Sequence, residues 1–511
     1  MRPQANRNRE RRTLTGDIQG EQEETSGLNQ HDTPLFSALL AHAKRNPIQF
    51  HIPSHKRGRG MHSAFQAFIG QNALSIDLIN IAPLDDLHNP TGIIKEAQAL
   101  AAEAFGADET FFSVQGTSTA IMAMVLATVG PDEKILVPRN VHKSVLTAIM
   151  LSGARPVFLH PEVDTELGIM HGLSVETVEQ ALFQNPDAKA LVVINPTYFG
   201  IAADLRRIVE IAHRYDVPVL VDEAHGIHTA FHEDLPVSAM QAGADMAATS
   251  VHKLGGSMTQ SSVLNVRRGL VDPRHVQVVL SMLTTTSTSY LLLASLDAAR
   301  KELALYGRER MEKAIALANE ARRLVNQIPG LYCPGREILR SSATYALDPT
   351  KLIISVKDLG LRGYDVEVML REEFNIEVEL SDLYNVLCVI SWGDEREDIL
   401  RLVDALAHIS AAYRDQIGKR TVQVKVPSMP ELRMSPRDAF YAKTEVVPFH
   451  ESVGRTIAEM IMVYPPGIPI LLPGEVVSRD NLDYIEENLR AGLPVQGPDD
   501  PEIRTIKVVR A

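Results

Sequence analysis

The sequence predicts an α/β protein with a mainly parallel sheet in a large domain and an α+β region toward the C-terminus. Between residues 134 and 250, short apolar runs alternate with amphipathic helical stretches, a pattern typical of parallel strands covered on both faces. Asn195, Asp222 and Ser250 each close one of these runs. Because ligands of such sheets bind at the carboxyl ends of the strands, these residues are expected to lie beside a site.

Local sequence patterns predict the following helices and strands, in chain order. A first helix is expected over 33–46, where Leu35, Phe36, Leu39 and Leu40 share one face. An alanine-rich helix over 93–105 and an apolar helix over 119–129 come next. The remaining strands are expected at 134–138, 156–159, 190–195, 217–222, 246–250, 351–356, 376–380 and 386–390, and the remaining helices at 144–151, 175–183, 205–215, 291–328 and 396–413.

These elements divide the 511 residues into four predicted segments. Residues 1–32 form a polar tail with almost nothing to bury, which predicts disorder. Residues 33–310 form an N-terminal arm and the large domain, 311–425 a small α+β domain, and 426–511 a C-terminal domain.

Composition argues against several classes of protein. The net charge of −13 speaks against nucleic acid as the main partner. Apolar runs stay shorter than the roughly 18–20 residues of a membrane-spanning helix, and the N-terminus lacks the apolar core of a secretory signal. Cys333 and Cys388 cannot form a disulfide framework and show no metal-ligand spacing. We therefore expect a cytoplasmic protein without a metal site.

The most informative stretch is Ala248-Thr249-Ser250-Val251-His252-Lys253-Leu254-Gly255-Gly256. A lysine follows a strand-like segment and runs into paired glycines, which allow close approach of the backbone. Asp222 closes the apolar strand before it, where a buried carboxylate needs a cationic partner. The two residues indicate a pyridoxal 5'-phosphate (PLP) site, with Lys253 as the covalent anchor and Asp222 as the partner of the pyridine nitrogen.

Two further segments suit the same cofactor. Gly116, Thr117 and Ser118 open an apolar helix, whose free N–H groups, dipole and hydroxyls favour a phosphate. His142 follows a buried strand and can stack on a pyridine ring. A helix cap and a surface histidine are the plainer alternatives for these segments.

The tetrapeptide Asp222-Glu223-Ala224-His225 also matches a helicase signature. That reading requires a phosphate loop of the form G-x-x-x-x-G-K-[ST], and the sequence has none. We therefore set the helicase interpretation aside.

In these motifs the chain resembles the Orn/Lys/Arg decarboxylase family of PLP enzymes, which has the aminotransferase-like fold (fold type I). The likeness runs from about Pro34 to the C-terminus and is greatest to the shorter biosynthetic arginine decarboxylases of Bacillus-type bacteria. The matching motifs, in family order, are Gln115–Ser118, Arg139–Ser144, Ser250–Gly256, Tyr464–Pro469 and Pro473–Glu475.

The resemblance implies roles for single residues. Lys253 binds PLP, Asp222 pairs with the ring nitrogen and His142 stacks on the ring. Thr117, Ser118 and Ser250 hold the phosphate of PLP, and His225 and His252 line the site. The chain departs from the family where Ser54 replaces a loop glycine and where only about fifty residues, in place of a wing domain, precede that loop. Large ring assemblies are therefore not expected.

The implied reaction is α-decarboxylation of a basic amino acid, most simply L-arginine to agmatine and carbon dioxide in polyamine biosynthesis. Lys253 and His225 are alternative acids for returning a proton to the α-carbon. Lysine or ornithine as the substrate, an aminotransferase or aldolase, and a non-catalytic scaffold or regulatory protein remain as alternatives.

The resemblance also implies a homodimer or a dimer-based homo-oligomer, since fold type I sites are completed by a neighbouring subunit. The polar run Thr284-Thr285-Thr286-Ser287 is a candidate for reaching a partner's phosphate, with an ordinary helix start as its alternative. A guanidinium needs an acidic partner, and Asp438 and Glu475 are the substrate-binding candidates.

Overall fold

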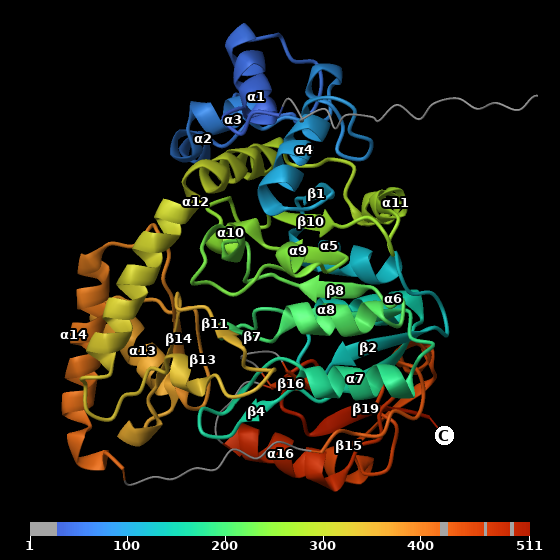
Figure 1. Cartoon of the computed structure of the whole chain (residues 1–511), viewed down its shortest axis with the longest axis vertical. Helices are drawn as coiled ribbons and strands as arrows, with labels where there is room; N and C mark the ends of the chain where they lie inside the picture. The colour runs from blue at the N-terminus through green and yellow to red at the C-terminus, as the bar shows by residue number, and fades with distance from the viewer. Residues whose placement is uncertain (1–27, 419–427, 464–467, 491–494, 511) are drawn as a thin grey trace, which may run out of the picture.

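The computed structural model describes residues 28–418, 428–463, 468–490 and 495–510 (Figure 1). Most of the predicted tail therefore lies outside the described residues, and its disorder stays a prediction. The described chain forms a layered body with a central sheet, helices on both of its faces, and a second, smaller sheet at its side.

The central sheet has seven strands in the order β1-β10-β9-β8-β6-β2-β3. The five strands from β9 to β3 are parallel, and β10 runs antiparallel to both of its neighbours. This confirms the mainly parallel sheet. The strands are β1 (Glu109–Ser113), β2 (Lys134–Pro138), β3 (Arg155–Leu159), β6 (Ala190–Ile194), β8 (Val219–Asp222), β9 (Met246–Thr249) and β10 (Ser262–Val266).

Successive side chains of β8 point to opposite faces of the sheet, which explains why no polar residue interrupts its apolar run. Leu220 packs into one hydrophobic cluster, whereas Val219 and Val221 pack into another on the opposite face. Helices supply the other side of each cluster, so both faces of the sheet are buried. The first cluster involves α5 (Gly116–Leu126), α6 (Lys143–Ser152) and α11 (Pro273–Leu283), and the second involves α7 (Val175–Gln184), α8 (Leu205–His213) and α9 (Ala239–Ala242).

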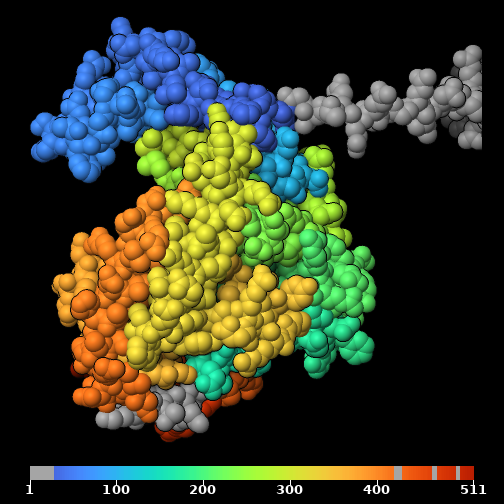
Figure 2. Space-filling view, turned by 60° about the vertical axis from the view of Figure 1, so that its left-hand side comes forward, coloured from blue at the N-terminus to red at the C-terminus, as the bar shows by residue number. Residues whose placement is uncertain are grey.

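The N-terminal arm lies at one end of the molecule, where it stands out from the body (Figure 2). A buried ion pair between Asp297 and Arg300 holds it: the Leu35 amide donates to Asp297 at 3.0 Å. Both charged residues belong to a helix of 36 residues that also reaches the smaller sheet. The helices here are α1 (Pro34–Arg45), α2 (Ser63–Ile69), α3 (Gln71–Ile76), α4 (Ile93–Phe105) and the long α12 (Tyr290–Val325).

The smaller sheet has the order β12-β14-β13 and packs against helices to form an α+β region. Its members are β12 (Lys351–Ser355), β13 (Leu380–Ser381), β14 (Asn385–Val389), α13 (Gly363–Phe374) and α14 (Arg396–Ala412). The strand predicted over 376–380 is wrong except for its last residue. Glu377 and Glu379 are exposed, so the segment before Leu380 runs over the surface as a loop.

The C-terminal elements form a third group, drawn in red in Figure 1. They make two small antiparallel sheets, β15 with β19 and β17-β16-β18. The elements are α15 (Pro436–Tyr441), β15 (Thr444–Pro448), β16 (Ile461–Val463), β17 (Ile468–Leu471), α16 (Arg479–Arg490), β18 (Val495–Gln496) and β19 (Thr505–Val509). Within the part of the chain that the structure describes, no helix is both long enough and apolar enough to cross a membrane.

Candidate active site

Side chains at or just beyond the ends of three parallel strands, β8, β9 and β2, meet at one edge of the central sheet. Asp222 ends β8, Lys253 lies four residues beyond the end of β9, and His142 lies four residues beyond the end of β2. A cavity of about 260 Å³ opens there, as expected for the carboxyl edge of such a sheet. Its lining residues are Asn140, Val141, His142, Met170, Ile194, Pro196, Thr197, Tyr198, Phe199, Asp222, Ala224, His225, Lys253 and Leu380.

Lys253 is held by the short helix α10 (Val251–Leu254) and points its amine into this cavity. Its Nζ lies 2.7 Å from Nε2 of His225 and 5.4 Å from the centre of the Tyr198 ring. Burial lowers the pKa of Lys253, while Asp222 and Glu379 oppose that shift. A lowered pKa makes more of the neutral amine available, which is the nucleophilic form.

Asp222 is 5% exposed and faces the same cavity. Its Oδ1 accepts a hydrogen bond from the Ala224 amide at 3.2 Å. Burial raises the pKa of this carboxyl, and His142 and Lys253 counter only part of that rise. A cation placed in the cavity beside Asp222 would offset the remaining cost of burying the charge.

A cluster of hydroxyls joins the start of α5 to Ser250, three residues before Lys253. α5 begins at Gly116, which has a φ of +78°, three residues earlier than expected from the sequence. Thr117 Oγ1 shares hydrogen bonds with the hydroxyls of Ser250 and Ser262, the latter at 2.8 Å. Ser118 follows in the first turn, whose N–H groups have no acceptor within the helix. This group of donors and hydroxyls can hold an anion.

His142, which is expected to stack on the ring, and His252, which is expected to line the site, differ in position. His142 lines the cavity and caps α6, accepting from the Ser144 amide at 3.2 Å. His252 is next to Lys253 in sequence, but its Nδ1 lies 2.8 Å from the Ser261 carbonyl oxygen and it is not among the lining residues. The structure therefore brings His142 to the cavity and turns His252 toward a neighbouring loop.

Asp438 and Glu475, the expected substrate contacts, do not line this cavity. Glu475 is fully buried and pairs through both oxygens with Arg139, at 2.9 Å for Oε2. Asp438 is exposed in the first turn of α15, where Ser435 donates to its carboxylate at 2.7 Å. In this subunit Glu475 belongs to a buried ion pair, and Asp438 lies in the first turn of α15 beside its N-cap residue Ser435, so the structure does not bring either residue to this cavity.

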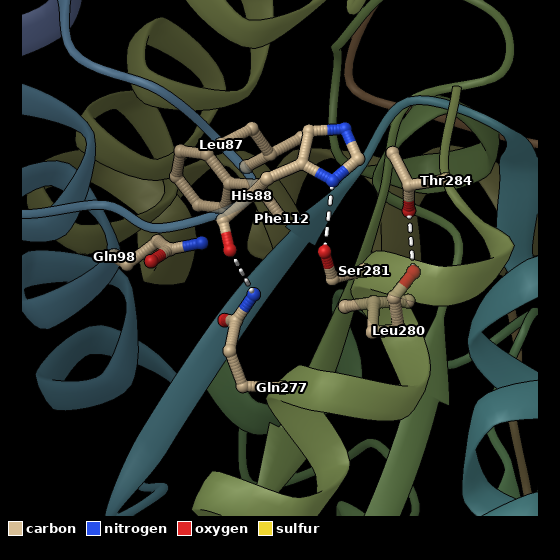
Figure 3. A pocket seen from close by; sticks show the side chains of 8 residues that line it. All are labelled: Leu87, His88, Gln98, Phe112, Gln277, Leu280, Ser281 and Thr284. Carbon is tan, nitrogen blue, oxygen red and sulfur yellow. Dashed lines mark hydrogen bonds between the residues drawn. The ribbon is translucent and has the colours of Figure 1, made fainter. Parts of the chain in front are cut away.

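The polar run Thr284–Ser287 ends α11, and Thr285, Thr286 and Ser287 are exposed. His88 fixes its start: the imidazole lies 2.8 Å from Ser281 Oγ and 2.9 Å from the Thr285 carbonyl oxygen. Figure 3 shows this histidine over a small pocket between α11 and β1. The pocket holds only about 10 Å³, the space of a single water, so it is not a ligand site.

The sequence did not lead us to three residues near the cavity, namely Tyr198, Glu379 and Lys351. The Tyr198 ring packs against His225, with centroids 4.2 Å apart, and its hydroxyl donates to Glu379 at 2.5 Å. Lys351 reaches His225 from the other side, with Nζ 3.0 Å from Nδ1. Tyr198 directly follows the cluster Asn195-Pro196-Thr197 at the end of a predicted strand, a signal that could have found it.

One expected family segment does not line the cavity, and most of another lies outside the described residues. The loop around Ser54 lies in the N-terminal arm, and Ser54 is exposed. Most of the motif Tyr464–Pro469 lies outside the described residues. The helicase interpretation finds no support, because Glu223 is buried and accepts from the Ala239 amide at 2.6 Å and from Thr249 Oγ1 at 3.1 Å.

PLP fits the residues present. An accessible lysine amine, a buried carboxylate without an ion-pair partner among the described residues, and an anion cradle on α5 match its aldehyde, its ring nitrogen and its phosphate, respectively. His142 and Tyr198 supply rings at the cavity wall. These features lie within one connected region of the fold.

Comparison with known proteins is consistent with this arrangement. The sequence profile of the Orn/Lys/Arg decarboxylase major domain matches residues 33–398, and that of the family's C-terminal domain matches 419–492. Arginine decarboxylase from Halalkalibacterium halodurans is 68% identical and that from Bacillus subtilis 64%, each over 94% of this chain and at least 98% of its own length.

Among solved structures, lysine decarboxylase A from Pseudomonas aeruginosa superposes with a TM-score of 0.81 at 26% identity. The match covers 93% of this chain and 80% of that one. A serine palmitoyltransferase from Sphingomonas wittichii, at 14% identity and a TM-score of 0.52, shares the fold alone. The aminotransferase-like fold type I predicted from the sequence is thus confirmed, and the chain belongs to the Orn/Lys/Arg decarboxylase family.

Proposed function

We propose that this chain is a PLP-dependent arginine decarboxylase, which converts L-arginine to agmatine and carbon dioxide. The observation that carries the proposal is the identity of 62–68% to bacterial arginine decarboxylases over 94% of the chain. The named lysine decarboxylases are far more distant, at 26–28% identity. Agmatine as the product links the chain to polyamine biosynthesis.

Each residue in and beside the cavity would have a separate role in holding PLP. Lys253 anchors the cofactor, Asp222 keeps its ring nitrogen protonated, and the α5 cradle with Ser250 holds its phosphate. When bound, PLP supplies an electron sink for the bond that breaks at the α-carbon. Phe199, Met170 and Leu380 give the cavity apolar walls, which limit water beside the departing carboxylate.

His225 is our choice over Lys253 as the acid that returns a proton to the α-carbon. The imidazole is 6% exposed and Nε2 points at the Lys253 amine, where the reacting atoms would lie. Burial lowers the pKa of His225 well below its usual value, and the Lys351 and Lys253 charges lower it further. The imidazole is therefore neutral near pH 7, and it can give its one N–H proton to the α-carbon when a donor at the other ring nitrogen replaces it; Lys351 Nζ lies 3.0 Å from Nδ1.

Glu379 is our candidate partner for the guanidinium group. Its exposed carboxylate accepts from the hydroxyl of Tyr198, which lines the cavity, and the next residue, Leu380, also lines it. A guanidinium pairs with a carboxylate through two parallel hydrogen bonds, which favours arginine over a single ammonium. Asp438 and Glu475 lack this position.

We also propose a cytoplasmic homodimer. Large apolar side chains on the projecting arm support a protein partner, because Ile48 is 83% exposed, Phe50 96% and Phe68 85%. Both cysteines are free and buried, as in a reducing compartment. Light scattering on the purified chain tests the dimer, and a fully active monomer would contradict it.

The decisive experiment is product identification. The purified chain with PLP is incubated separately with L-arginine, L-lysine and L-ornithine, and the amine is identified by mass spectrometry. Agmatine as the dominant product supports the proposal. Cadaverine or putrescine as the dominant direct product, with no agmatine, would reassign the substrate, and no amine at all would leave a non-catalytic protein.

A further inference from the structure

Lys351 is among the largest side chains that the structure buries, with 1% exposed. It opens β12, and its stem packs over Gly200, where an added Cβ would lie 2.6 Å from Lys351 Cγ. The path of the stem is therefore fixed by close packing. Burying an ammonium costs free energy unless other groups offset it, so the surroundings of this amine need a physical explanation.

A buried carboxylate provides part of the compensation. Asp348 is fully buried, and its two oxygens accept from His228 Nε2 at 2.9 Å and from Thr350 Oγ1 at 2.6 Å. Burial alone would raise the pKa of Asp348, but His228 and Lys351 outweigh it and bring the value to about 2. The carboxylate is thus ionised at neutral pH and favours the charged form of Lys351.

The amine of Lys351 contacts one histidine atom. Its Nζ lies 3.0 Å from His225 Nδ1. Burial lowers the pKa of Lys351 to about 8, with Asp348 and Glu379 acting against that shift and Lys253 adding to it. Below that pH the ammonium has three donors and no acceptor. His225 Nδ1 must then accept, which leaves the single proton of the neutral ring on Nε2.

The groups that face His225 agree with this assignment. Lys351 and Lys253 approach its two ring nitrogens, while His228 and His252 act on it from farther away. Each of these groups, when charged, disfavours a second proton on the ring. The ring is therefore neutral. Lys253 could donate to Nε2 only as an ammonium, a form that its lowered pKa disfavours and that its bond to the cofactor removes. In the cofactor-bound chain, the hydrogen bond from Lys351 therefore decides between the two tautomers.

We propose that Lys351 is a positioning residue that holds His225 in the Nε2-protonated tautomer and replaces the proton at Nδ1 when Nε2 protonates the substrate. The second half rests on the proposed decarboxylation; the tautomer does not. In the transfer the Nε2–H bond breaks as a C–H bond forms at the α-carbon, and one Nζ–H bond of Lys351 breaks as Nδ1–H forms. His225 stays neutral throughout, and Lys351 ends as a neutral amine.

The tautomer is tested by ¹⁵N NMR on the full-length chain labelled at histidine, before and after loading with PLP. His225 is assigned by the signal lost in His225→Gln. In the PLP-loaded chain we expect an unprotonated Nδ1 and a protonated Nε2 at pH 7, with the Nδ1-protonated form growing as pH rises through about 8. A protonated Nδ1 at pH 7 would overturn the inference without any variant being needed.

Lys351→Met removes the donor and keeps the length of the stem, and Lys357→Met, on a partly exposed lysine of the same region that pairs with Glu166, is the matched control. We expect Lys351→Met to populate both tautomers, to lower kcat by about 10²-fold, the scale of one proton-transfer group, and to lose the rate decrease above pH 8. Lys357→Met should match the wild type. An unchanged Nε2–H tautomer in folded Lys351→Met would show that another group sets it.

The two proposals fail in different ways. If wild-type chain forms no agmatine but His225 shows the expected tautomer, the proposed function fails and the positioning role stands. If agmatine forms but Nδ1 carries the proton, the inference about Lys351 fails and the proposed function stands.

Discussion

Glu475 and Arg139 lie 336 residues apart in sequence and form a bidentate ion pair with almost no exposed surface. Arg139 directly follows β2, three residues before His142, whereas Glu475 belongs to the C-terminal elements. The Leu472 amide donates to the same carboxylate at 2.8 Å. Burial raises the pKa of the Glu475 carboxyl more than Arg139 lowers it. The charged form of Glu475 therefore depends on its close contact with Arg139.

Glu475→Gln should destabilise the chain strongly, because it leaves a buried guanidinium without its counter-charge. Loss of one partner of a buried pair costs about 3–5 kcal/mol. Urea denaturation gives the free energy of unfolding. Glu233→Gln, in the exposed pair with Arg308, is the control and should change little; equal effects of the two substitutions would contradict the assignment.

Lys253→Ala should abolish covalent attachment of PLP and nearly all turnover. Borohydride reduction followed by peptide mass spectrometry locates the modified lysine in the wild type. Lys134→Ala, on a lysine paired with Asp187 far from the cavity, should keep the adduct. A reducible lysine adduct that persists in Lys253→Ala would place the anchor elsewhere.

Asp222→Asn should retain the cofactor but slow the reaction. The uncharged amide cannot hold a proton on the ring nitrogen, and loss of one preorganised electrostatic contact costs on the order of 10²–10³ in kcat. Cofactor content is measured after release in alkali, and kcat from carbon dioxide evolution. Turnover near the wild-type rate in this variant would remove Asp222 from the role we give it.

Glu379→Gln should weaken arginine binding and leave kcat nearly unchanged, since the contact is to a part of the substrate that does not react. The KM for arginine should rise by roughly 10-fold or more, the scale of a hydrogen bond to a charged group. Glu377→Gln changes a glutamate two residues away that pairs with Arg371, so it serves as the control. If the two variants have the same KM for arginine, Glu379 does not bind the substrate.

Glu223→Gln should remove part of the pH dependence of stability. Burial raises the pKa of Glu223 to about 7 from 4.5 in the unfolded chain, against the hydrogen bonds from Ala239 and Thr249. Between those values the folded state keeps a proton that the unfolded state has released, so wild-type stability falls as pH rises. The total is about 3 kcal/mol, and the variant should lack this fall when unfolding is measured from pH 5 to 8.

Much of the central sheet and the two central residues of the site follow from the sequence. β2 and α4 have the predicted bounds, and the carboxyl ends of β8 and β9 bring Asp222 and Lys253 together because parallel strands share an edge. β1 and β10 were missed. β10 is buried along its whole length but carries Ser262 and Asn265, so its pattern lacks the continuous apolar run of its neighbours.

The remaining parts of the site depend on contacts between distant segments. Lys351 and Glu379 come from the smaller sheet region, over a hundred residues from the carboxyl edge that they complete in space, and no local pattern marks a lysine that will be buried. Glu475 shows the converse case: its motif matches the family, but the sequence does not show that its carboxylate pairs with Arg139 in this subunit.

The single helix α12 connects two distant parts of the molecule. At 1.5 Å per residue its 36 residues give a path of about 54 Å along the helix, which runs from the arm to the smaller sheet. The helix contains no proline, and at its one glycine, Gly307, the Phe231 ring fills the space where a Cβ would lie. The smaller sheet region carries Lys351 and Leu380. One continuous helix therefore connects the N-terminal arm to the region that supplies these two residues.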